Sequence, residues 1–317
     1  MKIGYLKMKK TITILTPTLN EESNVDELVS RVSKVITEHP KYNFEHLFID
    51  NSSSDGTVDK LKKIAKKNKK VKVIVNARNF GAPSSVLHAL KQVKTDACIH
   101  IASDLQDPPE VIPDLLKKWE EGFKIVVLVK NESKENQFIF YLRKIYYRIL
   151  TVISDTPPIE NSTGNGLIDR DVLNILRTIN DPLSFLRGIL VEIGFPIGRV
   201  FFTQPTRKQG NTSNNLYGLY EVAVVGITNH SKVPIRFLSI LGFILSILSF
   251  ILAASYLLLK VLNWDSFEVG MAPLLIGLFF FGSIQMFFLG LIGEYIAAIH
   301  TRVRDMPSVI ESERINF

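Results

Sequence analysis

The chain has 317 residues, one cysteine and a formal net charge of +7, and its length leaves room for one good-sized domain and something smaller. Cys98 has no partner in the chain, which excludes intramolecular disulfides and indicates a reducing compartment. The six histidines show no metal-ligand spacing, so none is a candidate ligand.

Strands and helices alternate along the first part of the chain. Short apolar runs predict strands over residues 11–15, 44–49, 71–75, 97–102 and 125–129. Apolar residues at helical spacing predict helices between them. This alternation is typical of an α/β fold with a mostly parallel, nucleotide-binding sheet.

Polar residues gather where four of these strands end. They are Asn20 and Glu21, Asp50, Arg78 and Asn79, and Asp104. The carboxyl ends of parallel strands share one edge of a sheet, where open α/β sheets bind their ligands. We therefore expect the four clusters to line one crevice.

Residues 97–110, ACIHIASDLQDPPE, combine a buried strand, an acidic turn and a helix that begins at the proline pair. Asp107 and Glu110 have the spacing of a helix cap and its capping-box partner, so we expect Asp107 to cap that helix. Asp104 has no such local role. Beside the Gln106 amide oxygen, its carboxylate either suits a hard divalent cation such as Mg²⁺ or is a solvated turn residue.

Two polar stretches follow later in the chain. Residues 161–170, NSTGNGLIDR, predict a glycine-rich turn that leads into another helix. Residues 206–215, TRKQGNTSNN, combine cations, hydroxyls and glycine, as a phosphate-binding loop does. The alternative for this second stretch is a basic segment held by lipid headgroups beside a membrane.

Two long apolar runs predict a membrane hairpin. Residues 237–259 carry no charge over 23 residues, and residues 269–293 carry none over 25. Each run exceeds the roughly 20 residues that span a bilayer as a helix. Either run alone could be a buried core helix, but two in tandem favour spans at about 237–259 and 271–293.

The charges around these runs predict their orientation. The connecting loop carries one lysine and two acidic residues, whereas basic residues flank the other ends: Lys232, Arg236, Arg302 and Arg304. By the positive-inside rule, both termini lie in the cytoplasm and the loop lies outside.

Several motifs occur in the order known from one family. TPTLNEE at 16–22, IDNSSSDGT at 49–57, RNFG at 78–81 and SDLQDPPE at 103–110 precede RG at 187–188, RKQGNTS at 207–213 and GEY at 293–295. As an ordered set they resemble the polyprenyl-phosphate glycosyltransferases, a group of inverting GT-A enzymes that includes bactoprenol glucosyltransferases and dolichyl-phosphate mannosyltransferases. The resemblance covers nearly the whole chain.

With the apolar runs, the resemblance implies four regions. A cytoplasmic GT-A nucleotide-sugar-binding domain would cover residues 1–213, and an amphipathic juxtamembrane segment would cover 214–234. Two transmembrane helices would lie within 235–300, and a cytoplasmic tail would cover 301–317.

The resemblance also implies roles for individual residues. The nucleotide and donor would be held by Pro17, Asn20, Glu21, Asp50, Asp55, Arg78, Asn79 and Ser103, with Asp50 accepting an N–H from the base. Asp104 and Gln106 would hold Mg²⁺ or Mn²⁺ on the donor diphosphate. Phosphates of donor or acceptor would lie near Arg187, Arg207, Lys208 and Ser213, and catalysis would depend on Asp104, Arg207 and Lys208.

Two positions depart from the family's pattern. The metal motif of the family reads Asp-x-Asp, but Ala102 stands at its first position, so one carboxylate would share the metal with diphosphate and water. Many relatives carry an Asp, proposed as a base, in a GDFRL-like stretch, whereas TGNGL places Gly164 there. The base cannot be carried over, and the fallback candidates are Asp155, Glu160 and Asp169.

With these features, the resemblance implies an inverting transfer of one sugar from a nucleotide sugar, expected to be UDP-linked, to undecaprenyl or another polyprenyl phosphate at the cytoplasmic membrane. The lipid-linked sugar would serve envelope glycan modification. A phosphate acceptor is largely ionised at neutral pH and needs no base. The alternatives are transfer to a hydroxyl of a glycan or glycolipid, and an inactive membrane scaffold that only binds nucleotide sugar. We expect no nucleic-acid partner, and we expect a homo-oligomer.

Overall fold

The computed structural model describes residues 9–131, 159, 161–179, 186–205, 233–262, 271–303 and 307–317. The chain divides into two units. The first comprises Met1–Thr151, Thr156–Leu219 and Asp305–Phe317, and the second comprises Val152–Asp155 and Tyr220–Arg304. The last residues of the chain therefore belong to the first unit.

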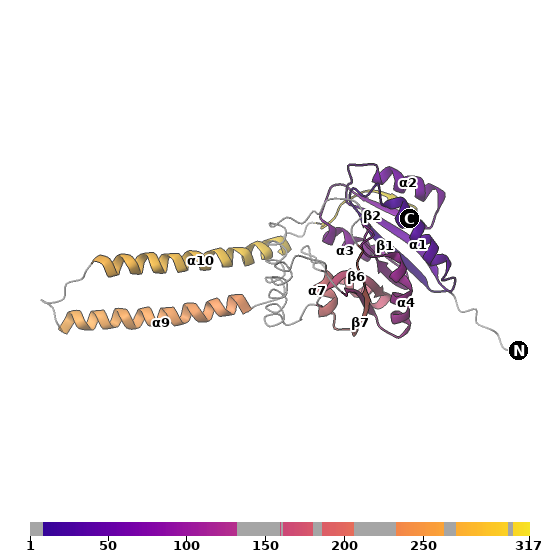
Figure 1. The fold of residues 1–317 in the computed structure, drawn as a ribbon. Coiled ribbons are helices and arrows are strands. Elements are labelled where there is room, and N and C mark those ends of the chain that lie inside the picture. The colour runs from indigo at the N-terminus through magenta and orange to yellow at the C-terminus, as the bar shows by residue number, and fades with distance from the viewer. Residues whose placement is uncertain are drawn as a thin grey trace. The chain divides into compact units, whose positions relative to one another are not determined.

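An eight-stranded sheet forms the centre of the first unit, with the strand order β7-β5-β6-β4-β1-β2-β3-β8 (Figure 1). Pairs that involve β6 or β8 are antiparallel, and the other pairs are parallel. The strands are β1 (Thr11–Thr18), β2 (Asn43–Asp50), β3 (Val71–Asn76), β4 (Ala97–His100), β5 (Ile125–Lys130), β6 (Ser162–Asp169), β7 (Ile197–Phe202) and β8 (Glu311–Ile315). The expected mostly parallel sheet and its first five strands are confirmed.

The prediction of a turn over residues 161–170 is wrong, because β6 occupies this stretch between β4 and β5. Gly166 has a φ of +149°, and a Cβ built on it would lie 2.0 Å from the carbonyl oxygen of Val126 in β5. Here glycine permits the close approach of two strands rather than a turn.

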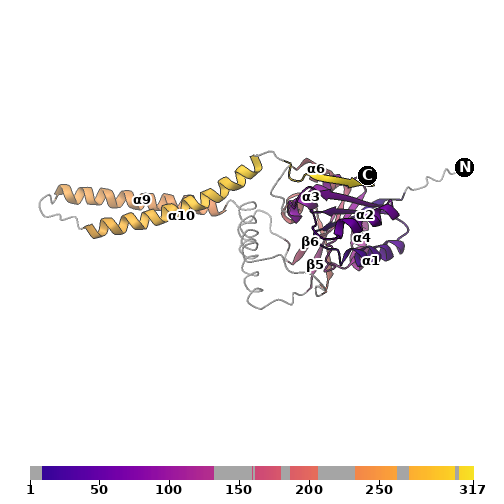
Figure 2. The ribbon, with the colours of Figure 1, turned by 90° about the horizontal axis from the view of Figure 1, so that it is seen from above.

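The chain returns to the first unit through β8, which pairs with the outer edge of β3 (Figure 2). The Ser312 hydroxyl donates to the Val75 carbonyl at 3.0 Å, and Asn316 donates to the carbonyls of Ala65 and Val71 at 2.8 Å each. We expected residues 301–317 to form only a tail, but residues 311–315 belong to the sheet. A short, charged strand is typical of a sheet edge.

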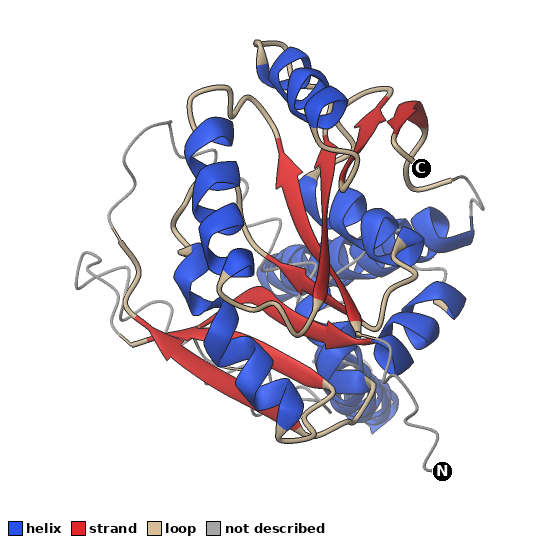
Figure 3. Ribbon diagram, turned by 90° about the vertical axis from the view of Figure 1, so that its right-hand side faces the viewer, coloured by secondary structure: helices blue, strands red, loops and turns tan. Residues whose placement is uncertain are grey.

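Helices cover both faces of the sheet (Figure 3). Apolar residues of α1, α2 and α4 join one core cluster, and those of α3, α6 and α7 join another. Adjacent strand residues point to opposite faces, so Ile14 joins the first cluster and Leu15 joins the second. The helices are α1 (Val25–Thr37), α2 (Thr57–Lys67), α3 (Ala82–Gln92), η1 (Pro109–Val111), α4 (Ile112–Glu120), α6 (Arg170–Thr178) and α7 (Leu186–Glu192).

The second unit contains two long helices, α9 (Val233–Leu262) and α10 (Met271–Val303), which run in opposite directions (Figure 1). Both expose large apolar side chains, for example Phe250 at 75% and Met286 at 72%. Within the described part of the chain, the segment Phe280–Ala297 is long and apolar enough to cross a membrane. Ile240–Leu252 in α9 is a shorter apolar segment.

Candidate active site

The carboxyl ends of β1 to β4 lie along one edge of the sheet, as expected. Thr18 pairs with Asp50, and Asp50 pairs with Val75, so three strands end in one row. β4 runs parallel to β1, β5 and β7 end at the same edge, and the antiparallel β6 begins there. Loops from all of these strands can therefore contribute to one site.

Two loops at this edge hold each other in place. The backbone N–H of Asn20 donates to the Ser53 hydroxyl at 2.8 Å, and that hydroxyl donates to the Asp50 carboxylate at 2.6 Å. The Asn20 side-chain oxygen accepts from the Ser54 N–H at 2.8 Å. Asn20 has a φ of +56°, which Asn tolerates better than most residues. The first two family motifs thus interlock.

Asp50 lies beneath these loops with no exposed surface. Its carboxylate also accepts from the Ser53 N–H at 2.8 Å and from the Thr18 hydroxyl at 3.0 Å. In this structure Asp50 holds the loop, and its contact with a nucleotide base stays a prediction.

Asp55 stabilises the start of α2. Its carboxylate accepts from the Thr57 N–H at 3.0 Å and from the Glu22 N–H at 3.2 Å. Burial acts to raise the pKa of Asp55, but hydrogen bonds from Thr57 and Glu22 lower it below its usual value. Glu21 accepts from Asn24 at 2.6 Å. Both acids therefore have structural partners at this edge of the sheet, where Pro17 is half-buried at the end of β1.

Asn51 is a site residue that the strand-end pattern does not reveal. It is 4% exposed, and its oxygen accepts from the Phe80 N–H at 2.9 Å, the Ser85 hydroxyl at 2.9 Å and the Asn76 amide at 3.0 Å. Its own amide donates to Asn79 at 2.6 Å. Asn51 therefore fixes the RNFG loop against β2 and β3. The position of Asn51 directly after Asp50 is the sequence signal that could have identified it as a residue of this site.

Arg78 and Asn79 keep exposed side chains on that loop. The Arg78 guanidinium lies 4.0 Å from the centroid of the Phe80 ring and donates to the Asn79 carbonyl at 3.0 Å. An exposed cation and an exposed amide thus lie at the strand end where the resemblance predicts the donor.

Asp104 and Gln106 lie in the turn after β4. The Asp104 carboxylate accepts from the Gln106 N–H at 3.1 Å, and the Gln106 side chain accepts from Gln204, just beyond β7, at 3.4 Å. Ser103 is buried beside them. No group of three or more His, Cys, Asp or Glu side chains in the described ranges could hold a metal. Within the described residues, Asp104 and Gln106 would therefore supply only part of a cation's ligand set.

The prediction that Asp107 caps the following helix is wrong. Asp107 is buried and accepts a hydrogen bond from the Asn165 amide of β6, and no side chain caps η1. Glu110 pairs with Arg31 at 2.6 Å instead of closing a capping box. Asp107 turns inward because β6 supplies a distant polar partner, which local spacing cannot show.

His100 in β4 and Asp107 in the following loop are both buried. His100 pairs with Gly166 of β6, and the half-buried Asn165 of β6 donates to Asp107. Burial raises the pKa of Asp107, against the hydrogen bond from Asn165. Burial also lowers the pKa of His100 to about 4. Among the residues described, neither His100 nitrogen nor Asp107 Oδ1 has a partner at hydrogen-bonding geometry, although the Gly164 backbone lies near the His100 ring. Three buried polar atoms near the start of β6 therefore have no hydrogen-bond partner in the described part of the chain.

Five residues that the sequence predicts for the site lie outside the described residues: Arg207, Lys208, Ser213, Asp155 and Glu160. Asp169 is described, but it pairs with Ala97 at the start of β4, on the opposite edge of the sheet. Its carboxylate caps α6 through the Asp171 N–H at 2.9 Å and accepts from Trp119 at 2.7 Å. Asp169 is therefore excluded as a base at this site.

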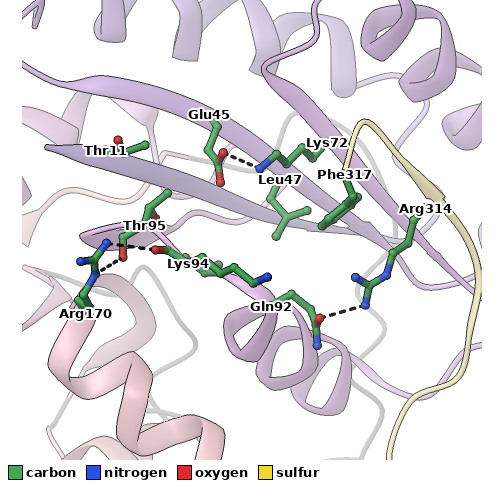
Figure 4. Close-up of a pocket in the computed structure, with 11 residues that line it drawn as sticks. Thr11, Glu45, Leu47, Lys72, Gln92, Lys94, Thr95, Arg170, Arg314 and Phe317 are labelled. Atoms are coloured by element: carbon green, nitrogen blue, oxygen red, sulfur yellow. Dashed lines mark hydrogen bonds and ion pairs between the residues drawn. The ribbon is translucent and has the colours of Figure 1, made fainter. Parts of the chain in front are cut away.

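A pocket of about 430 Å³ opens at the opposite, amino-terminal edge (Figure 4). Lys72 pairs with Glu45 at 2.7 Å, and Arg314 donates to Gln92 at 2.9 Å. Lys94 and Arg170 also line this pocket, and none of its lining residues belongs to the ordered motifs at the carboxyl edge. The edge with the polar loops is the candidate active site.

Comparison with known proteins decides the family. The family model described as glycosyl transferase family 2 matches residues 13–176, which is more than half of the chain. The chain belongs to glycosyl transferase family 2. It is therefore a glycosyltransferase with a GT-A-like, mostly parallel sheet, and the matched region contains most of β1 and all of β2 to β6.

Relatives of this family 2 glycosyltransferase cover nearly all of it. An uncharacterized glycosyltransferase from Synechocystis is 30% identical over 303 residues, 95% of each chain. The prophage bactoprenol glucosyl transferase homolog of Escherichia coli is 30% identical over 301 residues, 94% of this chain and 97% of that one. Such coverage extends over α9 and into α10.

Proposed function

We propose that this glycosyltransferase transfers a single sugar, with inversion, from a nucleotide sugar to undecaprenyl or another polyprenyl phosphate. The observation that supports this proposal most strongly is the similarity to the bactoprenol glucosyl transferase homolog over 94% of this chain. The expected donor is UDP-linked, and the lipid-linked product would serve the modification of envelope glycans.

The donor is proposed to lie along the edge formed by β1 to β4. The residues proposed to hold it are Pro17, Asn20, Glu21, Asp50, Asp55, Arg78, Asn79 and Ser103. Asn20, Arg78 and Asn79 are exposed and could contact the nucleotide directly. Asp50 and Asp55 would act by holding the loops.

The donor set at Asp104 and Gln106 fits a hard divalent cation. Both partly exposed side chains offer oxygen, the ligand that Mg²⁺ and Mn²⁺ prefer. A single carboxylate leaves coordination positions for the donor diphosphate and water. When bound, the cation would act as a Lewis acid toward the diphosphate as the sugar departs.

Membrane attachment is proposed through α9 and α10. Their 30 and 33 residues give lengths of roughly 45 and 50 Å, more than the ~30 Å hydrocarbon core. β7 precedes these helices and β8 follows them in the same sheet, so the chain must cross a membrane an even number of times between them. A span at Phe280–Ala297 therefore requires a second span, for which α9 is the candidate. The basic flanks favour a cytoplasmic sheet.

The acceptor phosphate is proposed to lie near Arg187, with Arg207, Lys208 and Ser213 contributing from their loop. A phosphate monoester has a second pKa of about 6, so it is already a nucleophile at pH 7. It needs positioning and charge balance rather than a base. This agrees with Gly164 in the family's base position and with Asp169 at the other edge.

Transfer assays with the purified full-length protein test this function. Nucleotide sugars are screened with undecaprenyl phosphate, with undecaprenol and with oligosaccharides as acceptors. We expect transfer to the lipid phosphate alone. Transfer to a hydroxyl acceptor and none to the lipid phosphate would contradict the proposal. Donor binding without any transfer would favour the inactive scaffold.

A further inference from the structure

β8 pairs with β3 in an irregular register at the point where β3 ends. Val75 pairs with Glu313, and the next residue, Asn76, pairs with Glu311. Ser312 is therefore an extra residue of β8 between these two pairs. Its hydroxyl donates to the Val75 carbonyl at 3.0 Å and to the Asn76 carbonyl at 3.4 Å. Such a bulge bends its strand, and bulges are common beside functional sites because they redirect the chain.

The RNFG loop, residues 78–81, begins just after this bulge. On the side where the chain enters the loop, the Ala77 N–H donates to the Ile310 carbonyl at 2.9 Å. On the side where it leaves, the chain forms α3, whose His88 pairs with Glu311 at 2.5 Å. β8 therefore holds the chain on both sides of the loop.

The loop is also tied to the end of β3 by buried amides. Asn76 is buried, and its amide donates to the Asn51 oxygen at 3.0 Å. The same oxygen accepts from the Phe80 N–H at 2.9 Å, and the Asn51 amide donates to Asn79 at 2.6 Å. A chain of hydrogen bonds thus runs from Ser312 through Asn76 and Asn51 to the loop.

We propose that β8 is a positioning element for the donor: its bulge at Ser312 sets the direction in which the RNFG loop leaves β3, and thereby the affinity for the nucleotide sugar. The inference rests on the proposed function, in which Arg78 and Asn79 contact the donor. β8 follows α10 in the chain, so the segment that returns from the second unit completes the donor site. A strand that merely covered the edge of the sheet would need neither the bulge nor the contact with Ala77.

Calorimetric titration of the purified full-length protein with Mg²⁺ tests this role. Each nucleotide sugar of the donor screen is titrated, and the tightest binder is used for every variant. Ser312→Ala removes the hydroxyl that holds both carbonyls, so we expect the donor Kd to rise roughly threefold to tenfold, with the acceptor KM unchanged. Ser312 is exposed, so the melting temperature should change little. Ser312→Thr keeps the hydroxyl and should retain most of the donor affinity.

Deletion of Ser312 is the stronger variant, because it removes the extra residue and lets the two strands pair regularly. The loop would then leave β3 in another direction. We expect the donor Kd to rise by roughly tenfold or more.

Asn316→Ala is the matched control, since Asn316 holds the other end of β8. Its amide donates to the carbonyls of Ala65 and Val71 at 2.8 Å each, and Val71 is the first residue of β3. The loss of these bonds should lower the melting temperature at least as much as Ser312→Ala does, but it should leave the donor Kd unchanged. This control separates positioning of the loop from stability of the strand.

Hydrogen exchange of the ligand-free protein gives a second measurement. Ser312→Ala should speed the exchange of the amides of residues 77–81 and leave those of β1 unchanged. Unchanged exchange in residues 77–81 would show that the bulge does not hold the loop.

An unchanged donor Kd in both Ser312→Ala and the deletion, or an equal rise in Asn316→Ala, would overturn the role of β8. If the unchanged protein binds a nucleotide sugar but transfers none to undecaprenyl phosphate, the proposed function fails, and the donor Kd values still decide the role of β8. If it binds no nucleotide sugar, both fail.

Discussion

At the scale of single residues, the polar motifs at the strand ends divide into two groups. Arg78 and Asn79 have exposed side chains, whereas Asp50 and Asn51 are buried and hold the loops. A substitution in the first group should act mainly on ligand binding. One in the second group should also lower the free energy of unfolding, because it leaves buried partners unsatisfied.

Asp104→Asn should reduce transfer by roughly a hundredfold or more while the fold persists, because it removes the carboxylate proposed to hold the cation. Transfer rates and melting temperatures check this, with Asp114→Asn, at an exposed position of α4, as the matched control. Excess EDTA should abolish transfer, and added Mg²⁺ or Mn²⁺ should restore it. Full activity in EDTA or in Asp104→Asn would remove the metal from the mechanism.

His46 should make the fold sensitive to acid. Burial lowers the pKa of His46 to about 3, and its neutral ring contacts the Thr16 hydroxyl at 3.0 Å. The pKa of His46 in the folded protein lies below the usual 6.5, so its contribution to the unfolding free energy is fully present above pH 6.5. This contribution is lost as pH falls toward 3, by up to roughly 1.4 kcal/mol per pH unit. His46→Gln should flatten the dependence of unfolding free energy on pH in this window. If unfolding free energy depended on pH equally in His46→Gln and the unchanged protein, His46 would not be the source of the acid sensitivity.

At the scale of elements, the sequence predicts what local pattern determines. β1 to β5 follow from branched apolar runs, because such runs fit a buried parallel sheet. β6 escapes prediction because its glycines suggest a turn, although Gly166 serves a close strand contact with Val126. β8 could not be predicted either, because a short, charged edge strand lacks the run of apolar residues that indicates a strand. The inward position of Asp107 depends on Asn165, 58 residues away in the chain, which no local spacing reveals.

Glu311 should fasten β8 to the sheet. It pairs with His88 at 2.5 Å and also with Arg314. Burial acts to raise the pKa of Glu311, but hydrogen bonds from Arg314 and His88 lower it. Its stabilisation is therefore present above the usual carboxyl pKa and lost as pH falls below it.

Glu311→Gln should consequently lower the unfolding free energy by about 1 kcal/mol at pH 7, and by less at lower pH. Hydrogen exchange of the β3 amides and melting curves provide the measurement. Glu313→Gln is the matched control, since Glu313 is exposed, pairs with Lys62 and should contribute little. Equal effects of the two variants would contradict this role of Glu311.

At the scale of the whole molecule, the return of the chain to its sheet constrains how it can meet a membrane. β8 and β7 belong to one sheet, so both ends of the proposed hairpin lie on the same side. The positive-inside rule favours the cytoplasm for that side. A single chain does not test the expected homo-oligomer, which stays a prediction.

Cysteine labelling in intact cells tests this topology after Cys98→Ala removes the native thiol. Ser266→Cys, between the apolar runs, should react with an impermeant reagent, and Ser308→Cys, just before β8, should react only after the cells are opened. The reverse pattern would overturn the orientation. Labelling of both sites in intact cells would contradict a crossing by α10.

The chemical nature of the product tests the central claim most directly. The purified full-length protein is given undecaprenyl phosphate and the selected nucleotide sugar, and the lipid product is examined by phosphorus and proton NMR. We predict a sugar phosphodiester whose anomeric configuration is opposite to that of the donor, formed with one equivalent of nucleoside diphosphate. A product with retained configuration, or free sugar released while the lipid stays a phosphate monoester, would contradict the account.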